Sequence, residues 1–108
     1  MDRAYIYILT NDNHSVLYVG VTTSLHERIL QHRRLEVGFT ARYNLTKLVY
    51  AEQHSDVRSA IEREKQLKSW SRLRKEKLIA ENNPAWQEIM PMEKVAVIFD
   101  VHLRYAQR

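Results

Sequence analysis

The first apolar run of the chain, Tyr5 to Leu9, has apolar or aromatic residues at every position. A strand that is apolar on both alternating faces is covered on both sides, so this run predicts a central strand. The cluster Asn11-Asp12-Asn13-His14 is typical of a turn, because Asn and Asp tolerate left-handed backbone and bond their own main chain. A second strand is predicted at 16–21. The two runs together indicate a β-hairpin.

A helix is predicted directly after the hairpin. Ser24 is followed three residues later by Glu27, which fits a capping box. Leu25 and Ile29 form the buried side of this helix, which should end near Arg33. A polar loop at about position 38 then leads to a third strand, predicted at 46–52.

Two further helices are predicted in the second half of the chain. Asp56 caps the first of them, and its buried stripe consists of four apolar residues, Val57, Ala60, Ile61 and Leu67. Ser71 caps the second, which should end before Asn83-Pro84 because the residue ahead of a proline disfavours helix. Strands and helices in the order ββαβαα predict an α/β (α+β) sandwich built around a three-stranded sheet.

The length of 108 residues predicts one domain, which we assign to residues 1–89. Residues 90–108 form a C-terminal extension of uncertain structure. Within it, Lys94 to Phe99 is compatible with an added strand, a short helix or a poorly packed segment, and periodicity does not decide among them.

The composition favours a polyanionic partner. The net charge is +4 and the isoelectric point is about 9.5, which suits nucleic acid or an anionic surface. The chain contains no cysteine, so disulfides and thiolate metal sites are excluded, and a reducing cytoplasm is expected. No apolar stretch approaches transmembrane length, so no membrane association is predicted.

Two tyrosines are expected to meet in the hairpin. With a loop of four residues, Asn11 to His14, Tyr7 lies directly opposite Tyr18, and Tyr5 lies opposite Gly20. Opposed side chains have Cβ atoms roughly 4.5–5.5 Å apart, so the two phenols would be neighbours. The pair either fills the core or presents two hydroxyl groups at one site.

The first helix carries Arg28 and His32 one turn apart. Helical spacing places His32 between the columns of Leu25 and Ile29, on the inward side. One interpretation is a partly buried histidine with an ordinary hydrogen bond. The other is a phosphate site, because a guanidinium binds two phosphate oxygens in a fork.

Glu64 occupies an unusual position, within the apolar stripe between Ala60 and Leu67. A carboxylate on a buried face must be paired, protonated or bound to metal. Lys68, one turn later, offers an ordinary ion pair. The alternative is a metal ligand for Mg²⁺ or Mn²⁺, which prefer hard oxygen ligands and keep several waters.

Residues 63–77 contain seven basic residues and only two glutamates. Such a run is often a solvated helix face. Here it borders the candidate metal carboxylate, which favours a surface that follows the phosphates of a nucleic acid. The candidate phosphate contacts are Lys65, Lys68 and Arg72.

In the order of these features the chain resembles the GIY-YIG nuclease superfamily, from about position 4 to 89. Tyr5-Ile6-Tyr7 resembles the first signature and Tyr18-Val19-Gly20 the second. Further segments are similar to the small single-domain bacterial branch, namely Gly38-Phe39-Thr40-Ala41-Arg42-Tyr43, Lys47-Leu48-Val49-Tyr50, Arg63-Glu64-Lys65-Gln66-Leu67-Lys68 and Asn83-Pro84-Ala85-Trp86. Tyr5 stands where the first signature has glycine, and Gly20 is expected to make room for its ring.

The resemblance implies a three-stranded antiparallel sheet flanked by helices and a metal-dependent endonuclease that cuts DNA. It implies a role for each candidate residue: Tyr7 as general base or water-orienting residue, Tyr18 as its hydrogen-bonding neighbour, Arg28 as phosphate ligand, His32 as proton-transfer partner and Glu64 as ligand of Mg²⁺ or Mn²⁺. Asn83 matches a site-ordering asparagine of some members, although its spacing from Glu64 is longer than in those members.

Two alternatives to a nuclease stay open at this point. One is a nucleic-acid-binding module with weak or no turnover that acts with a partner, and the other is a structural or protein-interaction domain. The resemblance implies DNA rather than RNA as the partner. Recognition of DNA by its shape, as in repair or recombination, is expected because the sequence contains no separate base-reading module. A homodimer or a partner protein is compatible with the sequence, which identifies no interface.

Overall fold

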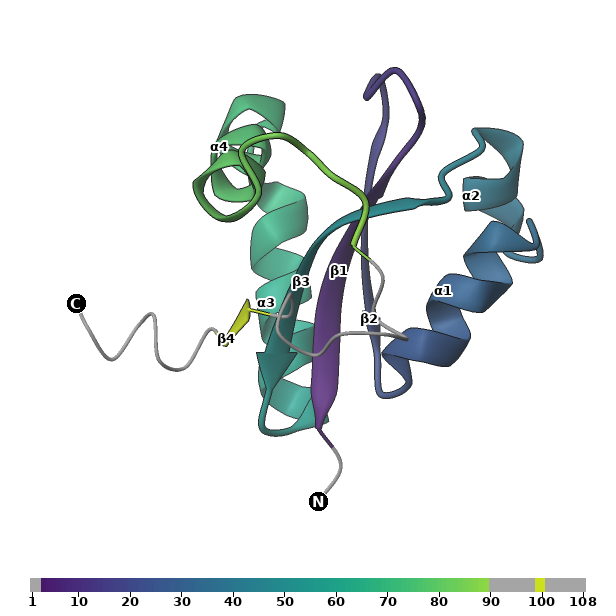
Figure 1. Cartoon of the computed structure of the whole chain (residues 1–108). Helices are drawn as coiled ribbons and strands as arrows, with labels where there is room; N and C mark the ends of the chain where they lie inside the picture. The colour runs from purple at the N-terminus through teal and green to yellow at the C-terminus, as the bar shows by residue number, and fades with distance from the viewer. Residues whose placement is uncertain (1–2, 90–98, 101–108) are drawn as a thin grey trace.

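The computed structural model describes residues 3–89 and 99–100 and contains a mixed sheet with helices on both sides (Figure 1). The strands are β1 (Ala4–Thr10), β2 (Leu17–Thr22), β3 (Lys47–His54) and β4 (Phe99–Asp100). The helices are α1 (Leu25–Arg33), α2 (Gly38–Arg42), α3 (Val57–Ser69) and α4 (Arg72–Asn82). The antiparallel sheet β2-β1-β3 is confirmed, with β1 in the centre, and β4 adds a short parallel pairing to β3.

Central strand β1 divides the core into two parts. Ile6 and Ile8 pack with Leu67 and Ile79 on the side of the sheet covered by α3 and α4. Tyr7 and other odd-numbered residues face α1 and α2 on the opposite side (Figure 1). Because successive side chains of a strand point to opposite faces, a strand that is apolar at every position serves both cores.

The register of the hairpin differs from the expectation by two positions. Tyr7 pairs with Gly20, and Tyr18 pairs with Leu9. The turn is longer than four residues, because the Asn11 Oδ1 accepts the amides of Ser15 and Val16, at 2.9 and 3.2 Å. Such side-chain bonds to the backbone compete with the strand ladder. A shift of two keeps every side chain on its face, so Tyr7 and Tyr18 remain neighbours with ring centroids 6.2 Å apart.

Helix α1 begins as predicted but without the predicted capping box. The Ser24 side chain makes no capping hydrogen bond. Instead, the Ser24 amide donates to the Thr22 hydroxyl at 3.0 Å. The Thr22 hydroxyl therefore accepts the amide that Glu27 would accept in a capping box.

Helix α2 was expected to be part of a polar loop. It has only five residues, and Thr40 is the buried one, whereas the neighbouring Phe39 is exposed. A helix of little more than one turn that buries a polar residue carries no apolar periodicity.

Both predicted caps in the second half are confirmed. Asp56 accepts the amide of Ser59 at 2.8 Å, and Ser71 accepts the amide of Arg74 at 3.2 Å. The predicted end of α4 before Asn83 is also confirmed. Strand β3 continues two residues beyond the predicted end, to His54.

The predicted apolar stripe of α3 is wrong in part. Val57 and Ile61 are 41% and 38% exposed, whereas Ala60 and Leu67 are buried. Arg63 takes the inward position between them, because its guanidinium has a buried partner on β3. The ion pair of Arg63 therefore helps to determine which side of α3 is buried, and this side differs from the one that the apolar residues predict.

Most of the C-terminal extension lies outside the described residues. This includes all of the segment from Lys94 to Phe99 except Phe99 itself. Residues 99–100 pair through their backbone with Glu52 and Gln53 of β3. In the described part of the chain, none of the helices has the length and apolar character needed to cross a membrane.

Candidate active site

The candidate site is built on the face of the sheet that α1 covers. The Tyr7 hydroxyl from β1 lies 3.0 Å from Nε2 of His32 on α1, and both side chains are buried. The Tyr18 ring from β2 adjoins both, with its centroid 5.8 Å from that of His32. Three of the predicted residues are therefore brought together.

A further polar residue completes this group. The Thr40 hydroxyl on α2 lies 2.7 Å from Nδ1 of His32, so both ring nitrogens have a hydrogen-bonding partner. Thr40 was not among the site residues predicted from the sequence. The only available signal was a threonine within a segment similar to the small bacterial branch, which gives no role to a particular side chain.

Burial sets the protonation of the Tyr7–His32 pair. Burial, followed by the nearby Tyr18, raises the pKa of the Tyr7 phenol above its ordinary value of 10.0, and the positive charge of Arg28 only partly opposes this. Burial, followed by the charge of Arg28, lowers the pKa of His32 from 6.5 to about 4. The positive charge of Arg28 by itself would favour a phenolate, but desolvation outweighs it. Both groups are neutral at neutral pH.

Arg28 and Glu64 supply the charges around this pair. Arg28, half-buried on α1, lies close enough to affect the pKa of both Tyr7 and His32. Glu64 on α3 also acts on the Tyr7 phenol, and its negative charge raises the pKa of that group. The first helix and the third therefore place opposite charges around one phenol.

Glu64 has the chemistry of a ligand for a hard cation. Its carboxylate side chain is 18% exposed and pairs at 3.2 Å with Lys68, whose side chain is 52% exposed. Among residues 3–89 and 99–100, His, Asp and Glu form no cluster of three or more that could hold a metal ion. A single carboxylate suits Mg²⁺ or Mn²⁺, which are commonly completed by waters and substrate phosphates, better than zinc, which requires three or four protein ligands.

The three predicted phosphate contacts have different surroundings. Lys65 is exposed, whereas Lys68 forms the ion pair with Glu64. The guanidinium of Arg72 donates to the carbonyl of Ser15 at 2.7 Å and to that of His14, and it pairs with Glu76 at 2.8 Å. Arg72 therefore fastens α4 to the hairpin turn, and Lys65 is the residue most available to a phosphate.

Asn83 joins the segment after α4 to the sheet. Its Nδ2 donates to the carbonyls of Val49 and Gln87 at 2.9 and 2.8 Å, and its Oδ1 accepts the Gln87 amide at 3.0 Å. These contacts fix the path of the chain beyond Pro84.

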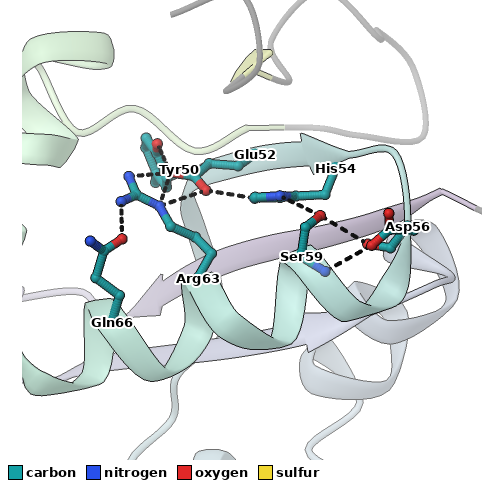
Figure 2. Close-up of polar contacts among 7 residues, drawn as sticks. All are labelled: Tyr50, Glu52, His54, Asp56, Ser59, Arg63 and Gln66. Atoms are coloured by element: carbon teal, nitrogen blue, oxygen red, sulfur yellow. Dashed lines mark hydrogen bonds and ion pairs between the residues drawn. The ribbon is translucent and has the colours of Figure 1, made fainter. Parts of the chain in front are cut away.

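A buried polar cluster on the other side of the sheet was also missed (Figure 2). Glu52 of β3 has no exposed surface and receives Arg63 Nε at 3.1 Å and Arg63 Nη2 at 2.8 Å. Tyr50 and His54 also bind this carboxylate. Burial alone would raise the pKa of Glu52, but the bonds from His54 and Arg63 outweigh burial and lower it. The available signal was Arg63 itself, three residues after Ala60 and four before Leu67.

Known proteins are similar to this chain over most of its length. A family model described as the GIY-YIG catalytic domain matches residues 3–77. A UPF0213 protein of Staphylococcus haemolyticus is 38% identical over 85 residues, which cover 75% of this chain and 99% of the relative. A UPF0213 protein of Natronomonas pharaonis is 33% identical over 81 residues, covering 71% of this chain and 91% of the relative. No solved structure gave a significant match.

Proposed function

The chain belongs to the GIY-YIG family, and from this premise we propose that it is a divalent-metal-dependent endonuclease that hydrolyses DNA phosphodiester bonds. The observation that carries the proposal is the buried Tyr7–His32 hydrogen bond beside the charge of Arg28. All the candidate residues fall within 1–89, which we propose as the nuclease domain, with 90–108 as an extension.

Arg28 is the proposed ligand of the scissile phosphate. Its guanidinium can bind two phosphate oxygens in a fork, and it stabilises the negative charge that develops as phosphorus is attacked. Binding a phosphate there also screens Arg28 from His32. The pKa of His32 then rises, because one of the two causes that lower it is offset.

Tyr7 and His32 move the proton that hydrolysis releases. The raised pKa of Tyr7 makes a free phenolate a costly intermediate. We therefore infer a relay in which water gives its proton to the Tyr7 oxygen while the phenol gives its own proton to Nε2 of His32. The water oxygen bonds to phosphorus, the bond from phosphorus to the leaving oxygen breaks, and solvent protonates that oxygen. Tyr18 supports the Tyr7 ring from the neighbouring strand.

Glu64 would hold the divalent ion. A bound Mg²⁺ or Mn²⁺ supplies positive charge that stabilises the phosphoryl oxygens during attack. Lys68 has to leave Glu64 before an ion takes its place, and its exposed side chain can turn into solvent. The Glu64–Lys68 contact is thus a resting ion pair in this proposal.

The surface around the site suits a nucleic acid. The net charge of +4 and the exposed Lys65 attract phosphates. The exposed rings of Phe39 and Tyr43 continue outward from Tyr18, with successive centroids 6.0 and 5.1 Å apart. Aromatic rings beside a phosphate site offer surfaces for bases. DNA recognised by its shape, as in repair or recombination, remains the proposed substrate in preference to RNA.

The proposal is tested by incubating the purified protein with supercoiled plasmid and labelled branched DNA and RNA, in Mg²⁺, Mn²⁺ or EDTA. Tyr7→Phe, Arg28→Ala and Glu64→Ala are each expected to reduce cleavage by at least ~10²-fold, while thermal unfolding shows that they fold. Full activity in one variant removes that residue from its role. Equal cutting by wild type and Glu64→Ala indicates a contaminant or a misplaced metal ligand.

Absence of cleavage together with tight binding in EDTA would favour the second candidate, a nucleic-acid-binding module. The Glu64–Lys68 ion pair is the observation that favours it, since a carboxylate already paired with lysine has less need of a metal. Such a module would bind DNA without metal, with an affinity that falls steeply as salt rises.

A further inference from the structure

Thr40 is a polar side chain with no exposed surface, although it lies in a helix of only five residues. Its hydroxyl lies between two groups, Nδ1 of His32 at 2.7 Å and the carbonyl of Val37 at 3.1 Å. The position of the hydroxyl is therefore determined on both sides. Its two partners have different hydrogen-bonding abilities.

Only one arrangement of protons on these atoms makes both contacts of the Thr40 hydroxyl hydrogen bonds. A threonine hydroxyl has one proton to donate, and a carbonyl can only accept. When the Thr40 hydroxyl donates to Val37, its oxygen is left to accept a proton from Nδ1 of His32. A neutral imidazole protonated on Nδ1 has its lone pair on Nε2, which faces the Tyr7 hydroxyl at 3.0 Å.

We propose that Thr40 is a positioning residue that holds His32 in the Nδ1–H tautomer, so that Nε2 can accept the proton of Tyr7. This inference rests on the proposed nuclease function for its purpose, although the tautomer itself does not. With the opposite tautomer, the Nε2 proton would point at the Tyr7 oxygen, and the relay would have no acceptor.

The backbone of α2 keeps this arrangement in place. The Val37 carbonyl accepts the Ala41 amide at 2.7 Å, which is the first bond of the helix. The same carbonyl accepts the Thr40 hydroxyl, so the helical turn holds an acceptor for that hydroxyl in place. The short helix is thereby connected to the proton chemistry through two hydrogen bonds.

The experiment measures the His32 ring nitrogens by ¹⁵N NMR in the metal-free protein. Wild type is expected to show a protonated Nδ1 and an unprotonated Nε2. Thr40→Val keeps the shape but removes the hydroxyl, and is expected to populate the Nε2–H form. Thr40→Ser should keep the wild-type pattern, and Thr23→Val, at an exposed threonine, should leave it unchanged.

A kinetic arm measures the consequence. Thr40→Val is expected to lower kcat on the order of 10²-fold with little change in KM, and Thr40→Ser should restore most of it. An Nε2–H signal in wild type would overturn the role of Thr40, as would an unchanged His32 spectrum in Thr40→Val. A protein that shows the expected tautomers but cleaves no nucleic acid would overturn the nuclease proposal alone.

Discussion

The phenol of Tyr7 lies directly across Gly20 of the neighbouring strand. A Cβ atom placed on Gly20 would lie 2.3 Å from Cζ and 2.4 Å from the hydroxyl oxygen of Tyr7. The sequence led us to expect that Gly20 accommodates Tyr5. In the observed register it accommodates Tyr7 instead, and this allows the phenol to reach His32.

Gly20→Ala should therefore displace the Tyr7 hydroxyl from His32. We expect cleavage to fall by ~10²-fold, comparable to the loss of a positioned acid–base group. Gly38→Ala is the matched control, because a Cβ at that glycine meets nothing within 4 Å. Plasmid-cleavage rates of the two variants give the test. Equal rates for Gly20→Ala and Gly38→Ala would show that the close approach does not matter for activity.

The Glu52–Arg63 pair should contribute strongly to stability. Glu52→Gln preserves the shape but removes the negative charge of Glu52 from the buried guanidinium of Arg63, which costs about 3–5 kcal/mol. Glu76→Gln weakens the exposed pair with Arg72 and should cost less than about 1 kcal/mol. Urea denaturation measures both. Similar midpoints for the two variants would contradict the importance of the buried pair.

The stability of the protein should fall with acidification because of His32. Its folded-state pKa of about 4 lies below the ordinary 6.5, so the unfolded chain binds the proton more tightly. His32 leaves the free energy of unfolding undiminished above pH 6.5. It lowers that free energy as the pH falls toward 4, by about 3 kcal/mol in total. His32→Gln cannot titrate and should show a shallower loss between those values. Unfolding at a series of pH values compares the slopes, and parallel curves would exclude His32 as the cause.

Lys65 and Arg72 should differ in their effect on DNA binding. Lys65→Ala is expected to weaken binding and to reduce the dependence of log K on log salt by about 1, because one phosphate contact is lost. Arg72→Ala should mainly lower stability, by about 1–3 kcal/mol, because its guanidinium binds carbonyls of the hairpin turn. Fluorescence titrations in EDTA at several salt concentrations measure the binding. The reverse pattern would show that Arg72 leaves the turn to contact DNA.

The sequence by itself determined strands β1 to β3, helices α1, α3 and α4, and the face that most of their side chains occupy. Alternation with period two placed Tyr7 and Tyr18 on one face, and a change of register by two could not separate them. Asp56 and Ser71 correctly predicted the starts of α3 and α4, because a cap is a local bond between a side chain and an amide three residues away. These features depend on neighbours in the chain.

Only the tertiary structure decided which polar groups meet in the interior. Side-chain bonds of Asn11 lengthened the turn and moved Gly20 opposite Tyr7. Arg63 pairs with the carboxylate of Glu52, eleven positions away on β3. Because of this pairing, Arg63 is buried in place of two residues of the predicted apolar stripe of α3. His32 and Thr40 meet across the turn between two helices, one of which has too few residues to show a pattern. A periodic pattern reports which face of an element is buried, whereas the partner of a buried polar group depends on how distant elements pack.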